Sequence, residues 1–198
     1  MNNLSDLANT IISDGELITQ SLRQLGILAI SSHAARESSV LLACNLQFVV
    51  THVNGKFRVY IYDPDIMSTV MDYRMGYGDG YRSFDTIEQV AEEYRLLVEV
   101  YKLRDSLRSL ILSAVANTRV TTANNVRVSL GEPFCIPLSP YVEFRCDVVA
   151  HPTGYECWLW DVTHDEPISN EWLGYCNSRR YQGADNVILE IRRLVKYI

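Results

Sequence analysis

The chain has 198 residues, of which 47% are hydrophobic and 21% charged, and its net charge is −6. This balance excludes an intrinsically disordered chain, and no apolar run reaches the ~20 residues that cross a bilayer. The negative charge lies in the first 100 residues, whereas the remainder is neutral. Nucleic-acid binding draws its affinity from neutralising phosphates, so we expect none of the general kind.

The first predicted element is a helix that begins at Ser13 and ends at Gly26. Ser13 and Glu16 have the spacing of a capping box, in which each side chain covers a free backbone amide. The predicted strands of this half are 45–53, 56–62 and 70–77. Asn54–Gly55 favours a tight hairpin turn between the first two strands. A second helix begins at Asp85.

The glycine-rich stretch GYGDGY, residues 76–81, falls between the third strand and this second helix. Glycines at such a place can cradle a phosphate. The stretch lacks a following GK[ST] and the spacing of a dinucleotide fingerprint, and Asp79 would repel an anion. We therefore predict a turn.

The second half repeats the first. HVNGKFRVYIYD (52–63) matches HPTGYECWLWD (151–161), and RMGYGDGYRSFD (74–85) matches WLGYCNSRRYQGAD (172–185). The predicted elements of the second copy are helix 104–116, strands 142–150, 154–161 and 171–176, and a helix from Asp185. We infer a tandem duplication of an α-β-β-β-α unit.

The predicted fold class is therefore α+β, with antiparallel sheets and helices packed on one face of each. The first repeat spans residues 1–101 and the second spans 102–198. Residues 118–140 fit neither copy and are predicted as an extra loop or hairpin in the second repeat.

The return strand of each hairpin carries large side chains on both faces. Alternation separates Phe57, Val59 and Ile61 from Arg58, Tyr60 and Tyr62, and in the second copy Tyr155, Cys157 and Leu159 from Glu156, Trp158 and Trp160. Either the chain covers the aromatic face itself, or Tyr60, Tyr62, Trp158 and Trp160 bind a partner. Aromatic side chains with a polar tip are enriched at the anchors of interfaces.

Other polar groups give weaker signals. His52 and His151 match between the copies and are interpreted as turn-flanking residues, since two ligands are too few for structural zinc. The acidic turns YDPD (62–65) and THDE (163–166) contain carboxylates that could hold a hard cation, but acidic turns are common. No pattern indicates a nucleophile with its base. We expect no metal and no cofactor.

Arginines next to the two glycine-containing loops are candidates for anion binding. They are Arg82 in the first copy and Arg179 and Arg180 in the second. A guanidinium pairs well with a carboxylate or phosphate, although neighbouring exposed arginines are usually only hydrated.

The five cysteines are odd in number and include no CxxC pair. Together with an N-terminus that lacks the basic and apolar regions of a signal peptide, they favour reduced thiols in a cytoplasmic protein. Cys146 and Cys157 face the same way on neighbouring predicted strands. We interpret them as a core thiol pair.

Two resemblances concern layout. GKFRVYIYDPD followed by RSFDTIEQVAEEY resembles the β-β-β-α layout of plant ethylene-response DNA-binding domains, yet these strands lack the arginines and tryptophans which those domains aim at the major groove. The chain is also similar to small acidic α/β secretion chaperones in its helix-then-strands order, low pI and apolar sheet surface.

The leading functional hypothesis is a non-enzymatic protein-binding module, such as an adaptor, chaperone or inhibitor, whose two sheets present aromatic anchors. Its partner would be another protein, with a two-fold symmetric partner or a homodimer suited to the internal repeat. One alternative is an enzyme with a small-molecule or nucleotide site between the repeats. The other is single-stranded nucleic-acid binding through aromatic stacking.

Overall fold

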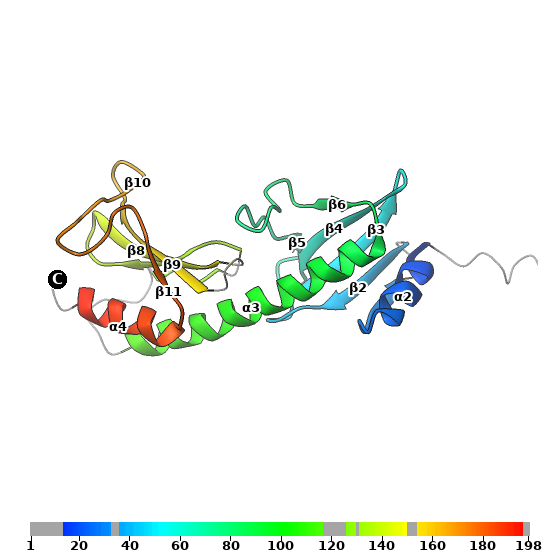
Figure 1. Cartoon of the computed structure of the whole chain (residues 1–198), viewed down its shortest axis with the longest axis horizontal. Coiled ribbons are helices and arrows are strands. Elements are labelled where there is room, and N and C mark those ends of the chain that lie inside the picture. Colours follow the sequence, from blue (N-terminus) through cyan, green and yellow to red (C-terminus); the bar gives the residue numbers. More distant parts are fainter. Residues whose placement is uncertain (1–13, 33–35, 117–125, 130, 150–153, 196–198) are drawn as a thin grey trace, which may run out of the picture. The chain divides into compact units, whose positions relative to one another are not determined.

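The computed structural model describes residues 14–32, 36–116, 126–129, 131–149 and 154–195. The chain divides into two compact units, Met1–Val98 and Glu99–Ile198. The described residues form three helices and two antiparallel sheets, which makes the fold α+β (Figure 1). None of the described helices combines the length and apolar character of a membrane-spanning segment.

The first unit contains a six-stranded sheet. Its strands are β1 (Ile30–Ser32), β2 (Glu37–Leu41), β3 (Gln47–Val53), β4 (Lys56–Asp63), β5 (Ser68–Thr69) and β6 (Arg82–Phe84). They follow the order β1-β2-β3-β4-β5, and β6 also pairs with β4. β5 and β6 thus share one edge of β4, with β5 beside its end and β6 beside its start.

Helix α2 (Asp14–Gln24) packs closely on β2. A Cβ atom on Gly15 would lie 2.7 Å from the Glu37 carbonyl oxygen, so glycine permits this approach. Two residues after the end of the helix, Gly26 has a φ of 81°. The Ile27 amide donates to the Leu22 carbonyl at 2.9 Å, as in a Schellman cap. The helix thus ends two residues before the predicted Gly26, which forms the cap. The predicted N-terminal cap Ser13 lies outside the described residues.

The predicted hairpin turn is confirmed. Asn54 and Gly55 have φ values of 53° and 76°, the positive pair that a type I′ turn requires. The turn sets the register of β3 and β4, which places Val49 opposite Tyr60 and Gln47 opposite Tyr62.

The predicted third strands, 70–77 and 171–176, are wrong. Both segments are turns, each closed by a bridge, Asp72 with Tyr77 and Asn170 with Tyr175. The Asp72 side chain accepts a 3.1 Å hydrogen bond from the Met75 amide. The Asn170 side chain accepts a 3.0 Å hydrogen bond from the Leu173 amide. These side-chain bonds replace the ladder bonds of a strand.

The GYGDGY stretch is a turn, as predicted. Gly76 and Gly80 have φ values of 82° and 79°. A Cβ atom on Gly78 would lie 2.7 Å from the Tyr73 ring. The stretch leads into β6 rather than directly into a helix.

The two helices predicted from Asp85 and over 104–116 are one continuous helix, α3 (Ile87–Val115). The residues between them contain neither glycine nor proline, so nothing in the backbone ends the helix there. The predicted boundary between Tyr101 and Lys102 therefore lies inside α3.

The second unit holds a five-stranded sheet and helix α4 (Ala184–Val195). Its strands are β7 (Phe134–Pro137), β8 (Val142–Val149), β9 (Gly154–Asp161), β10 (Glu166–Pro167) and β11 (Arg179–Tyr181). They follow the order β10-β9-β8-β7, and β11 also pairs with β9. β10 and β11 share the edge of β9 in the way that β5 and β6 share that of β4.

Candidate functional site

Cross-strand pairs show which residues share each face of the first sheet, because directly paired residues point the same way. One face carries two rows that run across the sheet. They are Ile30–Ser39–Val49–Tyr60 and Leu41–Gln47–Tyr62–Thr69. We call these eight residues the tyrosine face.

The opposite face contacts the helices of the unit. The Thr19 hydroxyl of α2 lies 2.8 Å from the Ser38 hydroxyl of β2. The Tyr94 ring of α3 packs edge-on against Phe48 of β3, with ring centroids 5.4 Å apart. Ser38 and Phe48 alternate with tyrosine-face residues along their strands, so they point away from it.

Tyr60 and Tyr62 are half-buried on the tyrosine face. The Tyr60 hydroxyl donates a 2.8 Å hydrogen bond to Glu37 Oε1. Burial and this carboxylate raise the pKa of Tyr60 well above its usual value, so the hydroxyl stays a donor. The sequence-predicted tyrosines are thus side by side, with one of them anchored by its polar tip.

The tyrosine face contains no charged residue, and two of its three aliphatic members, Ile30 and Leu41, reach solvent, whereas Val49 is buried. Ile30 is 68% exposed and Leu41 is 64% exposed. Charged groups begin in the next row, at Glu37 and Arg58. A charge-free centre with a charged margin is the composition of a protein interface.

The second sheet has an equivalent pair of rows. They are Arg127–Cys135–Arg145–Trp158 and Pro137–Glu143–Trp160–Pro167. We call these residues the tryptophan face. Trp158 and Trp160 occupy the positions on β9 that Tyr60 and Tyr62 occupy on β4.

Paired charges surround the tryptophans. Glu143 accepts hydrogen bonds from Arg127 at 3.1 Å and from Arg145 at 3.0 Å. The Arg145 guanidinium lies 4.1 Å from the centre of the Trp160 ring. The Trp160 indole N–H donates to Asp165 at 3.0 Å. Trp158 and Trp160 are both half-buried, so their rings are held in place and remain partly accessible.

Arg82 and Arg179 each lie beside a helical glutamate. Arg82 Nη1 is 2.6 Å from Glu93 of α3, and Arg179 Nη1 is 3.5 Å from Glu190 of α4. Both arginines also donate to a backbone carbonyl of the preceding turn. Each guanidinium is therefore engaged within its own unit.

Arg180 points elsewhere. It lies on β11 with 59% of its side chain exposed and is 3.6 Å from Glu156 of β9. Arg179, its neighbour on β11, reaches α4 instead, so the structure does not bring the two arginines together. Anion binding by Arg180 stays a prediction.

The remaining polar candidates are placed as follows. Cys146 and Cys157 are direct cross-strand partners, both free and buried, and burial raises the pKa of Cys146. His52 packs against Phe57, with ring centroids 5.2 Å apart. His151 lies outside the described residues. Among the described residues, no group of three or more His, Cys, Asp or Glu side chains could hold a metal ion.

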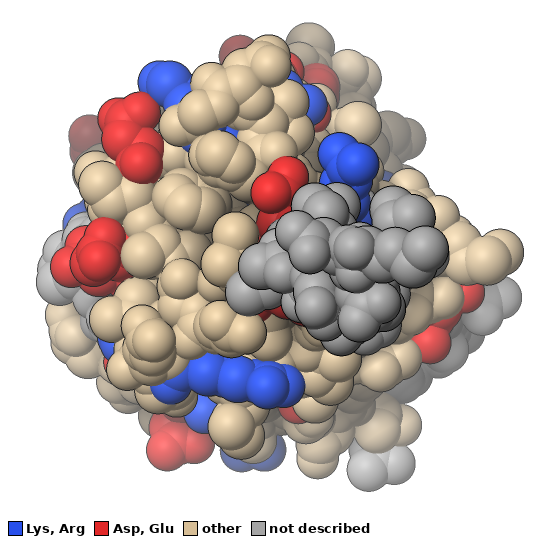
Figure 2. Space-filling view, turned by 90° about the vertical axis from the view of Figure 1, so that its right-hand side faces the viewer, with Lys and Arg blue, Asp and Glu red and all other residues tan. Residues whose placement is uncertain are grey.

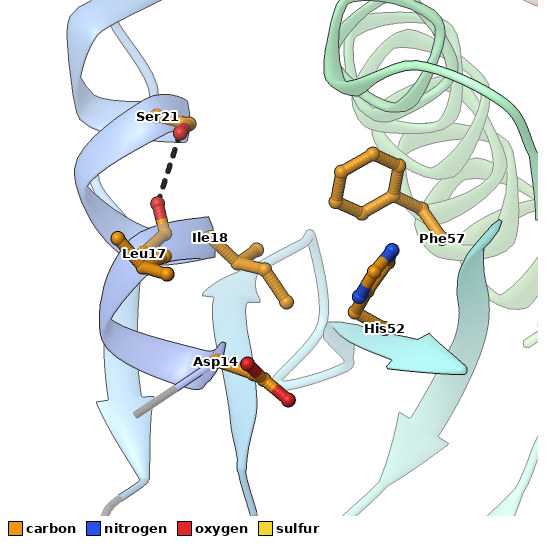
Figure 3. Close-up of a pocket in the computed structure, with 6 residues that line it drawn as sticks. All are labelled: Asp14, Leu17, Ile18, Ser21, His52 and Phe57. Atoms are coloured by element: carbon orange, nitrogen blue, oxygen red, sulfur yellow. Dashed lines mark hydrogen bonds between the residues drawn. The ribbon is translucent and has the colours of Figure 1, made fainter. Parts of the chain in front are cut away.

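A small cavity of about 190 Å³ lies between α2 and the β3–β4 hairpin. In Figure 3, Ile18 and Phe57 face each other across it, while Asp14 lies near His52. Figure 2 turns the right-hand side of Figure 1 toward the viewer, and there charged side chains are scattered over a largely uncharged surface. A second cavity of about 350 Å³ in the second unit is lined mainly by aliphatic side chains, among them Leu138, Leu159 and Leu194.

Sequence reasoning missed several members of both faces. Ile30 and Leu41 lie in strands that were not predicted, in a serine-rich stretch that reads as a loop. Glu143 and Arg145 could have been found, because they alternate with Phe144 and Cys146 along a predicted strand.

Comparison with protein-family models, curated proteins and solved structures found no match for this chain.

Proposed function

We propose that the protein is a protein-binding module whose contact surfaces are the tyrosine face and the tryptophan face. The observation that carries the proposal is the charge-free tyrosine face, which exposed Ile30 of β1 and Leu41 of β2 share with half-buried Tyr60 and Tyr62 of β4. An antiparallel sheet face that meets only water usually carries polar residues. Tyrosine, tryptophan and arginine are enriched among residues that dominate binding energy.

The two units are inferred to be copies of one ancestral unit, in which the described helices pack on one face of each sheet. Arg82 pairs with Val59 of β4, and Arg179 pairs with Cys157 of β9. The same turns precede these arginines, with Gly76 and Gly174 at φ values of 82° and 79°. Duplication would give the protein two related contact surfaces.

The two faces are expected to differ in the kind of partner surface that they bind. The tyrosine face offers uncharged apolar and hydroxyl groups, which suits an apolar patch on the partner. The tryptophan face offers Arg145 stacked on Trp160 beside Glu143, which suits a partner that supplies both apolar and charged contacts.

A photo-crosslinking side chain at position 41 tests the proposal. Leu41 is 64% exposed on the tyrosine face, and Leu189 of α4 is 60% exposed, so position 189 is the matched control. In cells of the source organism, a defined protein adduct is expected at position 41 and not at 189. Adding Tyr62→Ser should remove that adduct while circular dichroism stays unchanged.

Equal adducts at positions 41 and 189, or an adduct insensitive to Tyr62→Ser, would contradict the proposal. Tryptophan fluorescence gives a second readout. Trp172 is 83% exposed, so a Trp172→Phe background is needed to isolate Trp158 and Trp160. Acrylamide quenching of these two tryptophans should decrease when the crosslinked partner is added in purified form.

A further inference from the structure

β1 is an edge strand of the first sheet. Within the described residues it pairs with β2 alone. Successive residues of a strand direct their N–H and C=O groups to alternate sides, so β1 has backbone groups that point toward an open edge. The Ala29 carbonyl just before the strand accepts a 3.0 Å hydrogen bond from Arg23. The open edge therefore begins at Ile30.

Although Arg23 and Arg95 donate to the carbonyls of Ala29 and Leu25, the edge segment itself has no charged side chain. Leu28 is 87% exposed and Ile30 is 68% exposed. No residue from 25 to 32 is charged, and none is a proline. Proteins normally protect an edge strand with charges or proline, because an exposed apolar edge recruits other strands.

The second sheet provides an internal comparison. Arg127 forms a β-bridge with Cys135 of β7, and Ile30 pairs in the same way with Ser39 of β2, so the two residues occupy corresponding positions. The Arg127 guanidinium contacts both oxygens of Glu143 at 3.1 Å, and its side chain is 58% exposed. A charged side chain thus occupies the position that isoleucine occupies in the first sheet.

We propose that β1 pairs with β1 of a second copy of this chain, antiparallel, about a two-fold axis at Ser31. This pairing is self-complementary, because it sets Ile30 opposite Ser32 of the second copy and brings no charges of residues 25–32 together. A second copy is present wherever the chain is present. It can therefore cover the edge without any other protein, whereas an unrelated partner would leave an aggregation-prone strand exposed in its absence.

The pairing has two consequences. A strand of three residues gives a small contact, below the ~1,200 Å² of standard interfaces, so the dimer is weak. A two-fold axis perpendicular to the sheet also sets both tyrosine faces on the same side of one continuous sheet. That second consequence rests on the proposed function, whereas the dimer itself does not.

Sedimentation equilibrium of the full chain from about 10 μM to about 1 mM tests the pairing. A monomer–dimer equilibrium is expected. Ile30→Arg, which introduces the charge that Arg127 supplies in the other sheet, should weaken the dimer at least about tenfold. Leu189→Arg adds the same charge at a site of similar exposure and should leave the dimer unchanged. A monomer at every concentration, or a dimer insensitive to Ile30→Arg, would overturn the proposal.

Thiol crosslinking locates the axis. In a Cys44→Ser, Cys176→Ser background, Ser31→Cys chains treated with diamide should form a disulfide-linked dimer, since directly opposed strand positions have Cβ atoms about 5 Å apart. Exposed Ser68 of β5 provides the control, and Ser68→Cys chains should not crosslink. Equal crosslinking at both positions would overturn the proposal. Tyr62→Ser should leave the dimer intact, so failure of the dimer and failure of partner binding are distinguishable.

Discussion

Tyr175 donates a 3.0 Å hydrogen bond from its buried hydroxyl to the carboxylate of Glu190 in α4. Tyr77 makes the same 3.0 Å bond to Glu93 in α3. Each bond ties the turn before the last strand of a unit to the helix that follows. Although burial opposes it, hydrogen bonds from Arg193 and Tyr175 hold the pKa of Glu190 below its usual value.

Glu190→Ala is expected to destabilise the second unit. The change leaves the Tyr175 hydroxyl without its acceptor and removes the carboxylate that faces Arg179 and Arg193, at a cost of about 2 to 4 kcal/mol. Urea unfolding followed by tryptophan fluorescence measures this, because all three tryptophans lie in the second unit. Exposed Leu189→Ala is the control and should change stability by less than about 0.5 kcal/mol.

Tyr181→Phe is expected to leave the second unit as stable as before, or to stabilise it by up to about 1 kcal/mol. The Tyr181 hydroxyl is buried and, although it lies near the Tyr175 hydroxyl, makes no hydrogen bond of good geometry, so its removal relieves a desolvation cost. The first unit has Phe84 at the matching place, opposite Phe57 as Tyr181 is opposite Tyr155. A loss above about 1 kcal/mol in the same urea assay would show that the hydroxyl is satisfied in solution.

His164 is expected to titrate above its usual pKa of 6.5, because its Nδ1 lies 2.9 Å from Asp161 Oδ2. The same hydrogen bond holds the pKa of Asp161 below 3.8. The stability that protonated His164 adds to the folded turn is fully present below pH 6.5 and is lost as pH rises through the raised pKa of His164. The stability that ionised Asp161 adds to the folded turn is fully present above pH 3.8 and is lost as pH falls through the lowered pKa of Asp161.

The β9–β10 turn should therefore be most ordered at mildly acidic pH. NMR titration of the His164 ring measures the shift, and Asp161→Asn should return the His164 pKa toward 6.5. A histidine pKa unchanged by Asp161→Asn would refute the contact.

Gly15→Ala is expected to destabilise the first unit by about 1 to 3 kcal/mol, even though alanine favours helices. The new Cβ would meet the Glu37 backbone at 2.7 Å, and a strand backbone cannot yield as a flexible side chain can. Gly26→Asn provides the contrast, since Gly26 has open space around it and asparagine tolerates a φ of 81°. Thermal unfolding by circular dichroism should show Gly26→Asn close to wild type.

Local signals in the sequence were enough for the elements whose geometry depends on a few neighbouring residues. Asn54–Gly55 specifies its hairpin turn, and Gly26 specifies the end of α2. The alternation of residues in β4 and β9 also placed Tyr60 and Trp158 on the sheet face opposite the buried core residues of the same strands. In these places the residue pattern itself dictates the backbone.

The failures arose where tertiary contacts decide. Residues 70–77 alternate like a strand, but the Asp72 side chain closes a turn there. The serine-rich stretch around β2 has low apolar content, and it is a strand because its backbone pairs with β1 and β3, while the Ser38 hydroxyl contacts Thr19 of α2. The Tyr77–Glu93 and Tyr175–Glu190 bonds join residues 16 and 15 positions apart, a distance that no local pattern reports.

The continuity of α3 across Val98 and Glu99 also bears on how the chain begins to fold. Forming the first turn of a helix is unfavourable, whereas adding further residues to an existing helix is easy. During synthesis, residues up to Val98 can form the start of α3 with the first sheet before the second unit exists. The second unit then extends a helix already begun, whereas a chain that started at Glu99 would have to nucleate it unaided.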